Sequence, residues 1–149
     1  KRALKLAEKT PSLCNRQPWK TYIVSNKSII SELAHVQGGL RGFGQNMDKL
    51  LVITANNHYL KNYTERNDGF IAGGLYSMTL LYSLQYYGIA TCPLSAALTN
   101  ENDLKVRSIL NVPQNENMIL FIGIGEYLDE FETPKSHRSD FTNKSVFIS

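Results

Sequence analysis

The most informative stretch of the chain is PSLCNRQPWKTYIV, residues 11–24. A Pro-Ser turn leads to two amide residues, Asn15 and Gln17, and then to Pro18-Trp19, which opens a run of β-branched and aromatic residues. This run predicts a strand over residues 19–25. Amide side chains placed directly before a core strand indicate that they form hydrogen bonds with some group at the edge of the core. The rest of the sequence is needed to identify that group.

Length and composition limit the possibilities. A chain of 149 residues suits one domain with a core, and 42% hydrophobic residues exclude a disordered or collagen-like protein. The net charge of +3 is carried by scattered lysines and arginines, which is a weak signal for nucleic acid. Two distant cysteines, Cys14 and Cys92, form neither a disulfide framework nor a metal-ligand spacing, which suits a reducing cytoplasm.

The chain opens on KRALKLAEKT, which has no apolar core of a signal peptide and no initiator Met. Because the apolar spacing there is that of a helix, we expect a single domain over residues 1–149 whose N-terminal segment is incomplete.

Strands and helices are predicted to alternate, which favours an α/β or α+β sheet with both faces covered. The tail ends in VFIS, an apolar strand that needs a sheet edge in its own subunit or in a partner. Residues 70–90 are apolar over a membrane-like length, but Gly73, Gly74, Ser77 and Gln85 favour a buried helix of the fold or of a subunit interface. The predicted helices are 1–9, 27–36, 70–88 and 100–110, and the predicted strands are 19–25, 50–55, 89–92 and 118–125.

Familiar catalytic constellations do not emerge from the sequence. The glycine-rich loop GGLRGFG, residues 38–44, lacks the Gly-Lys-Ser/Thr of a P-loop, and the three histidines have no metal-ligand spacing. Cys14 has no histidine nearby in sequence to activate it, and Glu65 and Asp68 read as solvated charges before a helix. Neutral hydrogen-bonding residues at strand ends are what is left, and they suit a protein whose reactive centre is a bound cofactor.

Four segments in sequence order resemble the nitroreductase family of FMN-dependent, NAD(P)H-using enzymes. Residues 11–19 match its Pro-Ser-x-x-Asn-x-Gln-Pro-Trp signature, and residues 65–94 resemble its long central helix and the turn that follows. Residues 106–127 (VRSILNVPQNENMILFIGIGEY) and 134–141 (PKSHRSDF) resemble its last core strand and its terminal arginine motif. The resemblance implies a mixed sheet flanked by helices, in an intertwined homodimer.

By this resemblance, FMN is held by residues from distant parts of the chain and from both subunits. The amides of Asn15 and Gln17 bond the ribityl chain and the polar edge of the ring, and Arg138 grips the phosphate through its guanidinium fork. A backbone N–H near Ser95 or Ala96 points at flavin N5. The implied flavin-binding set is Pro11, Ser12, Asn15, Gln17, Arg41, Pro93, Leu94, Ser95, Ala96, Ser136 and Arg138.

Some members of this set have particular expected places. Pro11 and Ser12 line the site from the other subunit, and residues 93–96 form a turn against the flavin. Arg41, or Gln45 in the same glycine-rich loop, reaches the pyrimidine edge, where a donor stabilises the reduced flavin.

The implied activity is a ping-pong oxidoreductase that passes reducing equivalents from NAD(P)H through FMN to a small organic acceptor, nitroaromatic or quinone-like. No catalytic side chain is required, because solvent can supply protons. A cytoplasmic homodimer without metal, membrane or nucleic-acid partner is expected.

Two departures from the family pattern keep alternatives open. The Arg-Arg-Ser-x-Arg phosphate motif is missing, which supports a non-catalytic dimer acting as a scaffold or partner-binding module. The connector over residues 56–68 is short and polar, which predicts an open pocket over the flavin. The sequence pI near 8.9 leaves a nucleic-acid-binding protein as a further alternative.

Overall fold

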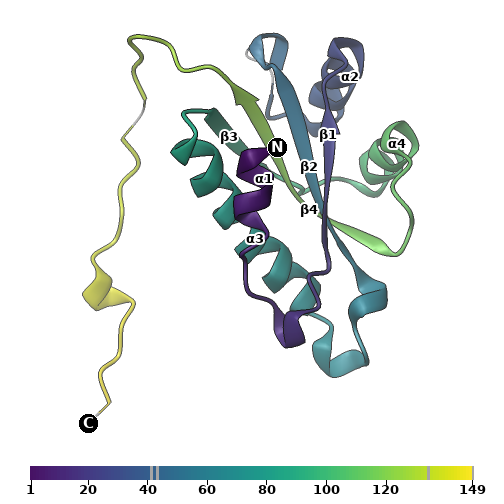
Figure 1. The fold of residues 1–149 in the computed structure, drawn as a ribbon, viewed down its shortest axis with the longest axis vertical. Helices are drawn as coiled ribbons and strands as arrows, with labels where there is room; N and C mark the ends of the chain where they lie inside the picture. The colour runs from purple at the N-terminus through teal and green to yellow at the C-terminus, as the bar shows by residue number, and fades with distance from the viewer. Residues whose placement is uncertain (41, 43, 134, 149) are drawn as a thin grey trace.

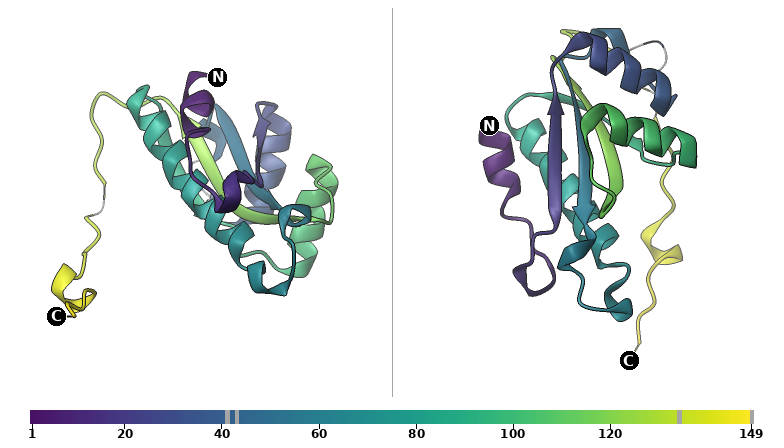
Figure 2. Two further views of the ribbon diagram at one scale, coloured as in Figure 1. Left: turned by 60° about the horizontal axis from the view of Figure 1, so that its bottom comes forward. Right: turned by 90° about the vertical axis from the view of Figure 1, so that its right-hand side faces the viewer.

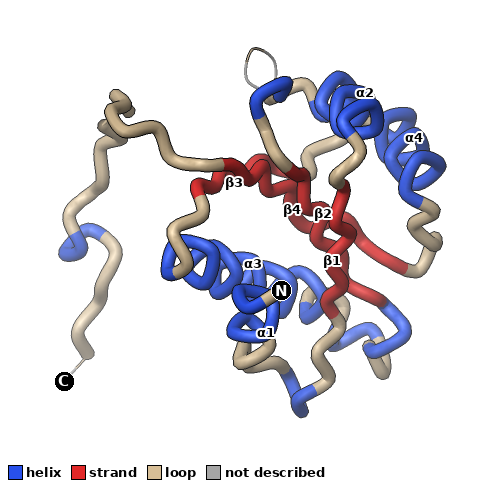
Figure 3. The backbone as a smooth tube through the Cα atoms, turned by 45° about the horizontal axis from the view of Figure 1, so that its top comes forward, coloured by secondary structure: helices blue, strands red, loops and turns tan. Residues whose placement is uncertain are grey.

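The computed structural model describes residues 1–40, 42, 44–133 and 135–148, and within them helices and strands alternate. The helices are α1 (Arg2–Ala7), α2 (Lys27–Gln37), α3 (Asp68–Tyr86) and α4 (Asn100–Leu110). The strands are β1 (Trp19–Val24), β2 (Lys49–Asn56), β3 (Ala90–Ser95) and β4 (Glu116–Gly125). Helices α1 and α3 cover one face of the sheet and α2 and α4 cover the other, so the molecule has three layers (Figure 1 and Figure 3).

The four strands form one sheet in the order β1-β2-β4-β3. All three neighbouring pairs are antiparallel, with Leu51 opposite Ile23 on one side and opposite Ile122 on the other. The expected α+β class with helices on both faces is confirmed, but the expectation of a mixed sheet is wrong for this chain. A mixed sheet needs at least one parallel pair, and the described strands form none.

Apolar side chains fill two cores because successive residues of a strand point to opposite faces. Phe121 and its neighbour Ile122 are both fully buried, the first toward α2 and α4 and the second toward α1 and α3. The continuous apolar runs of β2 and β4 are therefore explained by burial on both faces. The core also depends on a close approach: a Cβ on Gly73 of α3 would lie 2.7 Å from Cγ1 of Ile119.

The helix ends follow the residue types that the sequence offers. Asn26 caps α2 by accepting hydrogen bonds from the backbone N–H groups of Ser28 and Ile29, and Thr99 caps α4 by accepting from Asn102 N–H. Gly38, with a φ of 80°, ends α2 in the left-handed conformation that glycine adopts readily. These caps confirm the predicted starts of α2 and α4.

Strand β3 is longer than predicted. Pro93, Leu94 and Ser95, expected to form a turn against the flavin, pair with Ile122, Phe121 and Leu120 of β4. The proline is tolerated because β3 is an edge strand, where a missing N–H can face away from the neighbouring strand. The expectation of a turn at residues 93–96 is therefore corrected: residues 93–95 are strand, and the chain leaves the sheet only after them.

The C-terminal tail leaves the body after β4 (Figure 1 and Figure 2). Its described part contains one 3-10 turn, Phe141–Asn143, and no strand. Val146, Phe147 and Ile148 are 84% to 93% exposed, so the apolar end of the tail is not covered within this protomer. Among the described residues, no helix is both long enough and apolar enough to span a bilayer.

Candidate functional site

The loop that joins α1 to β1 carries unusual backbone strain. Cys14, Asn15 and Gln17 have φ values of 49°, 55° and 48°, in the left-handed region that residues with a side chain rarely adopt. Asparagine tolerates this conformation, whereas for the other two it costs on the order of 1 kcal/mol or more each. Strain of this size persists only where neighbouring contacts enforce it, and it concentrates at functional sites.

The two amides of this loop bond to each other. Gln17 Nε2 donates to Asn15 Oδ1 at 3.0 Å and to the Asn15 carbonyl at 3.2 Å, and the Gln17 backbone N–H donates to Ser12 Oγ at 2.9 Å. The structure thus brings Ser12, Asn15 and Gln17 together within one protomer. Within the described residues, Asn15 Nδ2 and Gln17 Oε1 have no partner, so the exposed pair offers one donor and one acceptor to a ligand.

Arg16, between the two amides, fastens the loop to the connector between β2 and α3. Its guanidinium donates to Glu65 Oε2 at 2.5 Å and to Oε1 at 3.1 Å, and also to the Tyr59 carbonyl at 2.9 Å. The side chains of Arg16 and Glu65 are only 15% and 17% exposed. Hydrogen bonds from Arg16 and from the Lys61 backbone N–H hold the pKa of the Glu65 carboxyl below its usual range.

From its sequence context Glu65 is expected to be a solvated charge, but in the folded chain it forms this part-buried ion pair. No local pattern reveals it, because 49 residues separate the two partners. A bidentate arginine placed between two binding residues is a signal that only the folded chain supplies.

At the other edge of the sheet, the end of β3 meets the start of the glycine-rich loop. Gln37 Nε2 donates to the Ser95 carbonyl at 3.1 Å, and Gln37 Oε1 accepts from the Gly39 N–H at 2.7 Å. A Cβ on Gly39 would lie 3.2 Å from Leu94 Cδ2, so the backbone at Gly39 packs closely against the Leu94 side chain. Gln37 is a further residue that the sequence analysis did not single out. Arg41 lies outside the described residues, as does the side chain of Gln45.

Ser136 and Arg138 lie on the exposed tail, away from both edges of the sheet (Figure 1). The Arg138 guanidinium donates to the carbonyls of Ser136 and His137, at 3.2 Å each. Because β1 and β3 are opposite edge strands, one protomer holds the predicted residues in three separate places: the loop before β1, the end of β3, and the tail.

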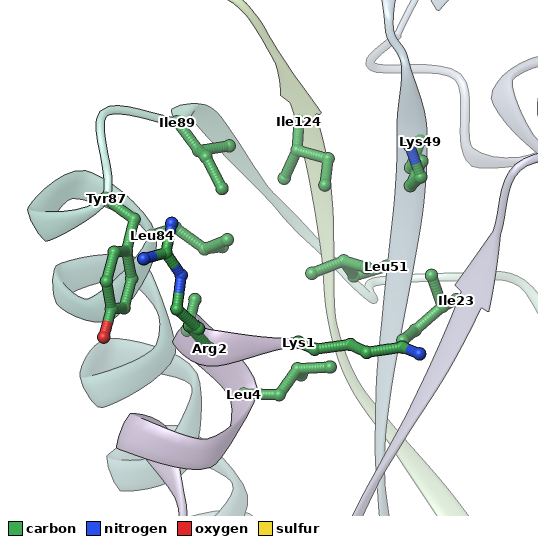
Figure 4. A pocket seen from close by; sticks show the side chains of 11 residues that line it. Lys1, Arg2, Leu4, Ile23, Lys49, Leu51, Leu84, Tyr87, Ile89 and Ile124 are labelled. Atoms are coloured by element: carbon green, nitrogen blue, oxygen red, sulfur yellow. The ribbon is translucent and has the colours of Figure 1, made fainter.

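A cavity of about 510 Å³ opens between α1, α3 and the sheet, at the end of α3 that precedes β3 (Figure 4). Its walls are mainly apolar, with Ile23 of edge strand β1 on one side and Leu84 on the other. The Arg2 guanidinium lies 5.0 Å from the centre of the Tyr87 ring. None of the predicted flavin-binding residues lines this cavity. It is therefore separate from the end of β3 and from the loop between α1 and β1 that carries Asn15 and Gln17, which we call the amide loop.

The described residues give little support for a metal site or for a reactive thiol. The described residues contain no group of three or more His, Cys, Asp or Glu that could hold a metal ion. Cys14 is exposed, while burial raises the pKa of the Cys92 thiol and keeps it protonated near neutral pH.

An apolar stripe runs along the outer side of α3. Five large residues at helical spacing are between 45% and 76% exposed. Within one protomer α3 is thus buried on its inner face only, which packs in the core, and burial of its outer side in a subunit interface stays a prediction. The stripe consists of Ile71, Leu75, Met78, Tyr82 and Tyr86.

No protein-family model and no curated protein matches the sequence. Solved structures do match it. YdfN of Bacillus subtilis, a proposed nitroreductase, has a TM-score of 0.84 and 17% identity, over 99% of this chain and 86% of that one. A nitroreductase-like protein of Streptococcus mutans has a TM-score of 0.82 and 18% identity, over 99% and 84% of the two chains. An FMN-dependent nitroreductase of Clostridium difficile has a TM-score of 0.77 and 20% identity, over 97% and 83%. The chain therefore has the fold of these structures over nearly its whole length.

Proposed function

We propose that this chain, which has the nitroreductase fold, is an FMN-dependent oxidoreductase that passes reducing equivalents from NAD(P)H to a small organic acceptor. A shared fold leaves the chemistry open, so the support has to come from the site. The observation that carries the proposal is the donor and acceptor that Asn15 and Gln17 leave without partners in a strained loop.

This pair fits the polar edge of a flavin ring. That edge presents two carbonyl acceptors with an N–H donor between them, and Asn15 Nδ2 and Gln17 Oε1 supply a donor and an acceptor side by side. The Gln17 amide is not free to reverse its ends, because its nitrogen donates to the Asn15 backbone carbonyl, which can only accept. The loop thus holds the hydrogen-bonding pattern ready before the ligand arrives, which lowers the entropy cost of binding.

Bound FMN would supply the two-electron redox chemistry. The protein's own part is to hold and shield it: Asn15 and Gln17 at the ring, the backbone of Ser95 and Ala96 alongside, and Arg138 with Ser136 at the phosphate. The guanidinium is suited to the last task because its planar fork matches phosphate oxygens. Protons come from solvent, so the site requires no acid or base of its own.

The site is proposed to be completed by a second copy of the chain, because one protomer keeps its three groups of binding residues apart. Two features favour this homodimer. The α3 stripe exposes a contiguous apolar surface, which in soluble proteins marks an interaction site. The tail ends in exposed Val146, Phe147 and Ile148, while edge strand β1 has no strand on its outer side in the described sheet.

Titration with FMN tests the function. The protein is expected to quench flavin fluorescence on binding, and NAD(P)H is expected to bleach the bound flavin. Asn15→Ala and Gln17→Ala should each weaken FMN binding by roughly threefold to tenfold, since each removes one hydrogen bond. Gln114→Ala is the matched control, because Gln114 is exposed and distant in sequence from the loop.

Three results would separate the alternatives. A protein that ignores FMN at millimolar concentration contradicts the proposal. If that protein still dimerises, the non-catalytic scaffold becomes the better description. Equal FMN affinity in wild type and both amide variants would leave a flavoprotein but remove the amide pair from its site.

A further inference from the structure

We propose that the Arg16–Glu65 ion pair is a positioning device, which holds Asn15 and Gln17 in their left-handed conformations and so presents both amides to the ligand. The ligand part of this inference rests on the proposed function. The conformational part does not, because it concerns the loop itself.

The loop needs an external restraint. Its other described hydrogen bonds, from residues 12–17, begin and end within the loop: Asn15 N–H to Ser12 O, Arg16 N–H to Leu13 O, and the bonds between Ser12, Asn15 and Gln17. Bonds of this kind move with the loop and do not fix it to the body. Within residues 12–17, Arg16 is the residue whose described bonds reach beyond the loop, to Tyr59 and Glu65. The next such bond comes only where the loop joins β1, where the Pro18 carbonyl accepts from the Asn56 N–H at 2.8 Å.

The anchor on the other side is itself well held. Glu65 accepts the Lys61 backbone N–H at 2.7 Å, in addition to both bonds from Arg16. Asn62 caps the 3-10 turn that contains Glu65 by accepting from the Thr64 N–H at 2.9 Å. This turn leads within a few residues into α3, which packs on the sheet. Arg16 therefore ties the loop to the base of the longest helix.

The position of Arg16 in the chain makes the anchor selective. Asn15 and Gln17 are its immediate neighbours, so fixing the Arg16 side chain limits rotation of the backbone on both sides. Neither Arg16 nor Glu65 belongs to the two cores, so loss of the pair should loosen the loop without unpacking the molecule. The two-pronged contact also explains an arginine here, because a lysine ammonium cannot engage both carboxylate oxygens in one plane.

The experiment compares four variants with wild type in the full chain. Arg16→Met and Glu65→Gln each break the pair, Arg16→Lys keeps the charge without the fork, and the double variant Arg16→Glu/Glu65→Arg exchanges the partners. The control is Lys105→Met, which breaks the exposed Lys105–Glu101 pair, 2.6 Å apart on α4. Backbone hydrogen exchange of the peptide covering residues 11–18 is measured by mass spectrometry, and FMN affinity is measured by fluorescence quenching.

Exchange over residues 11–18 is expected to rise about tenfold in Arg16→Met and Glu65→Gln, with exchange in β2 and β4 unchanged. The FMN dissociation constant should rise by a similar factor. The double variant Arg16→Glu/Glu65→Arg should bring both the hydrogen exchange and the FMN dissociation constant most of the way back to wild type. Arg16→Lys should bring them back only a little, and Lys105→Met should match wild type.

Unchanged exchange over residues 11–18 in both single variants overturns the inference, whether or not FMN binds. Faster exchange across the whole sheet also overturns it, because the pair would then support stability in general. If wild type binds no FMN, the proposed function fails, while the exchange data still decide whether Arg16 and Glu65 order the loop. If exchange rises but FMN affinity does not, the positioning role is rejected and the proposed function stands.

Discussion

At the scale of one residue, Cys14 shows that a left-handed backbone conformation in the amide loop can occur without a binding side chain. Three residues of the loop share the left-handed conformation, yet only Asn15 and Gln17 have side chains that bond within it. Asparagine adopts this conformation at low cost through local hydrogen bonds. Cys14 is exposed and carries the steric cost of a Cβ at positive φ.

Cys14→Gly is therefore expected to raise the free energy of unfolding by about 1 kcal/mol, because glycine removes the clash between Cβ and the backbone at positive φ. Urea denaturation measures the change. Cys14→Ala is the control and should be near neutral, since it keeps Cβ and loses only the thiol. Equal stabilisation by both substitutions would place the effect in the thiol and contradict the argument from backbone strain.

At the scale of the elements, α3 lies close to β4 because Gly73 of α3 has no side chain. A Cβ on Gly73 would meet Ile119 Cγ1 at 2.7 Å, whereas a Cβ on Gly69, one turn earlier on the buried face, would find Ala55 Cβ at an ordinary 3.6 Å. The two glycines thus share helix and burial but differ in the space in front of them.

Gly73→Ala should lower the free energy of unfolding by roughly 1–3 kcal/mol, because α3 must shift from β4 or Ile119 must change rotamer. Gly69→Ala should be neutral or stabilising by up to about 1 kcal/mol through helix propensity. Thermal and urea unfolding of both variants provide the comparison. A second change, Ile119→Val, should relieve part of the Gly73→Ala loss, and a loss unaffected by it would argue against this contact.

Glu116 links three strands at the end of the sheet where β1 begins. It is 2% exposed and accepts hydrogen bonds from Thr54 at 2.6 Å, Tyr22 at 2.8 Å and the Lys20 ammonium at 3.3 Å. Burial by itself would raise the pKa of this carboxyl, but the hydrogen bonds from Thr54, Tyr22 and Lys20 outweigh burial and lower it. The charged form is therefore the one that joins β1, β2 and β4.

Because the folded pKa of Glu116 lies below its ordinary value, its contribution to stability is present above that value and is lost as pH falls through the folded pKa. Glu116→Gln should reduce the free energy of unfolding by roughly 1–3 kcal/mol at pH 7. The difference from wild type should shrink toward pH 3. Urea denaturation at several pH values tests this, and a difference that is constant with pH would show that the charge of Glu116 is unimportant.

The elements also show what the sequence can and cannot predict. Apolar runs predicted β2 and β4, and cap residues such as Asn26 and Thr99 predicted the helix starts, because these signals act within a few residues. Pro93 favoured a turn locally, but pairing with β4 overrode it. The amide loop was recognised from its signature, whereas Arg16–Glu65 and Gln37–Ser95 are contacts across 49 and 58 residues, which no local pattern encodes.

At the scale of the whole molecule, one protomer keeps the predicted binding residues apart, and the proposed site therefore includes residues of a second chain. The amide loop and the end of β3 lie at opposite edges of the sheet, and Arg138 lies on a tail outside it. The α3 stripe offers the surface through which two copies could meet. Assembly and cofactor binding are therefore expected to fail together.

Leu75→Glu is expected to weaken self-association by roughly 100-fold, because a carboxylate in an apolar interface loses its hydration without gaining a partner. Sedimentation velocity measures the dimer, and FMN titration of the same samples should show a parallel loss. Leu104→Glu on α4 is the matched control, since Leu104 is similarly exposed on the opposite face of the sheet. Identical behaviour of the two variants would mean that the α3 stripe is not the interface.

The strand order has a consequence for how the chain is made. Strand β4 is the last to leave the ribosome, yet it fills the slot between β2 and β3 and contributes Phe121 to one core and Ile122 to the other. A nascent chain that stops short of residue 116 has α1 to α4 but lacks β4, so β2 and β3 are left without the strand that pairs with both of them. A translation pause just before β4 would thus prolong an aggregation-prone intermediate, and we expect chaperone binding to be strongest at that point of synthesis.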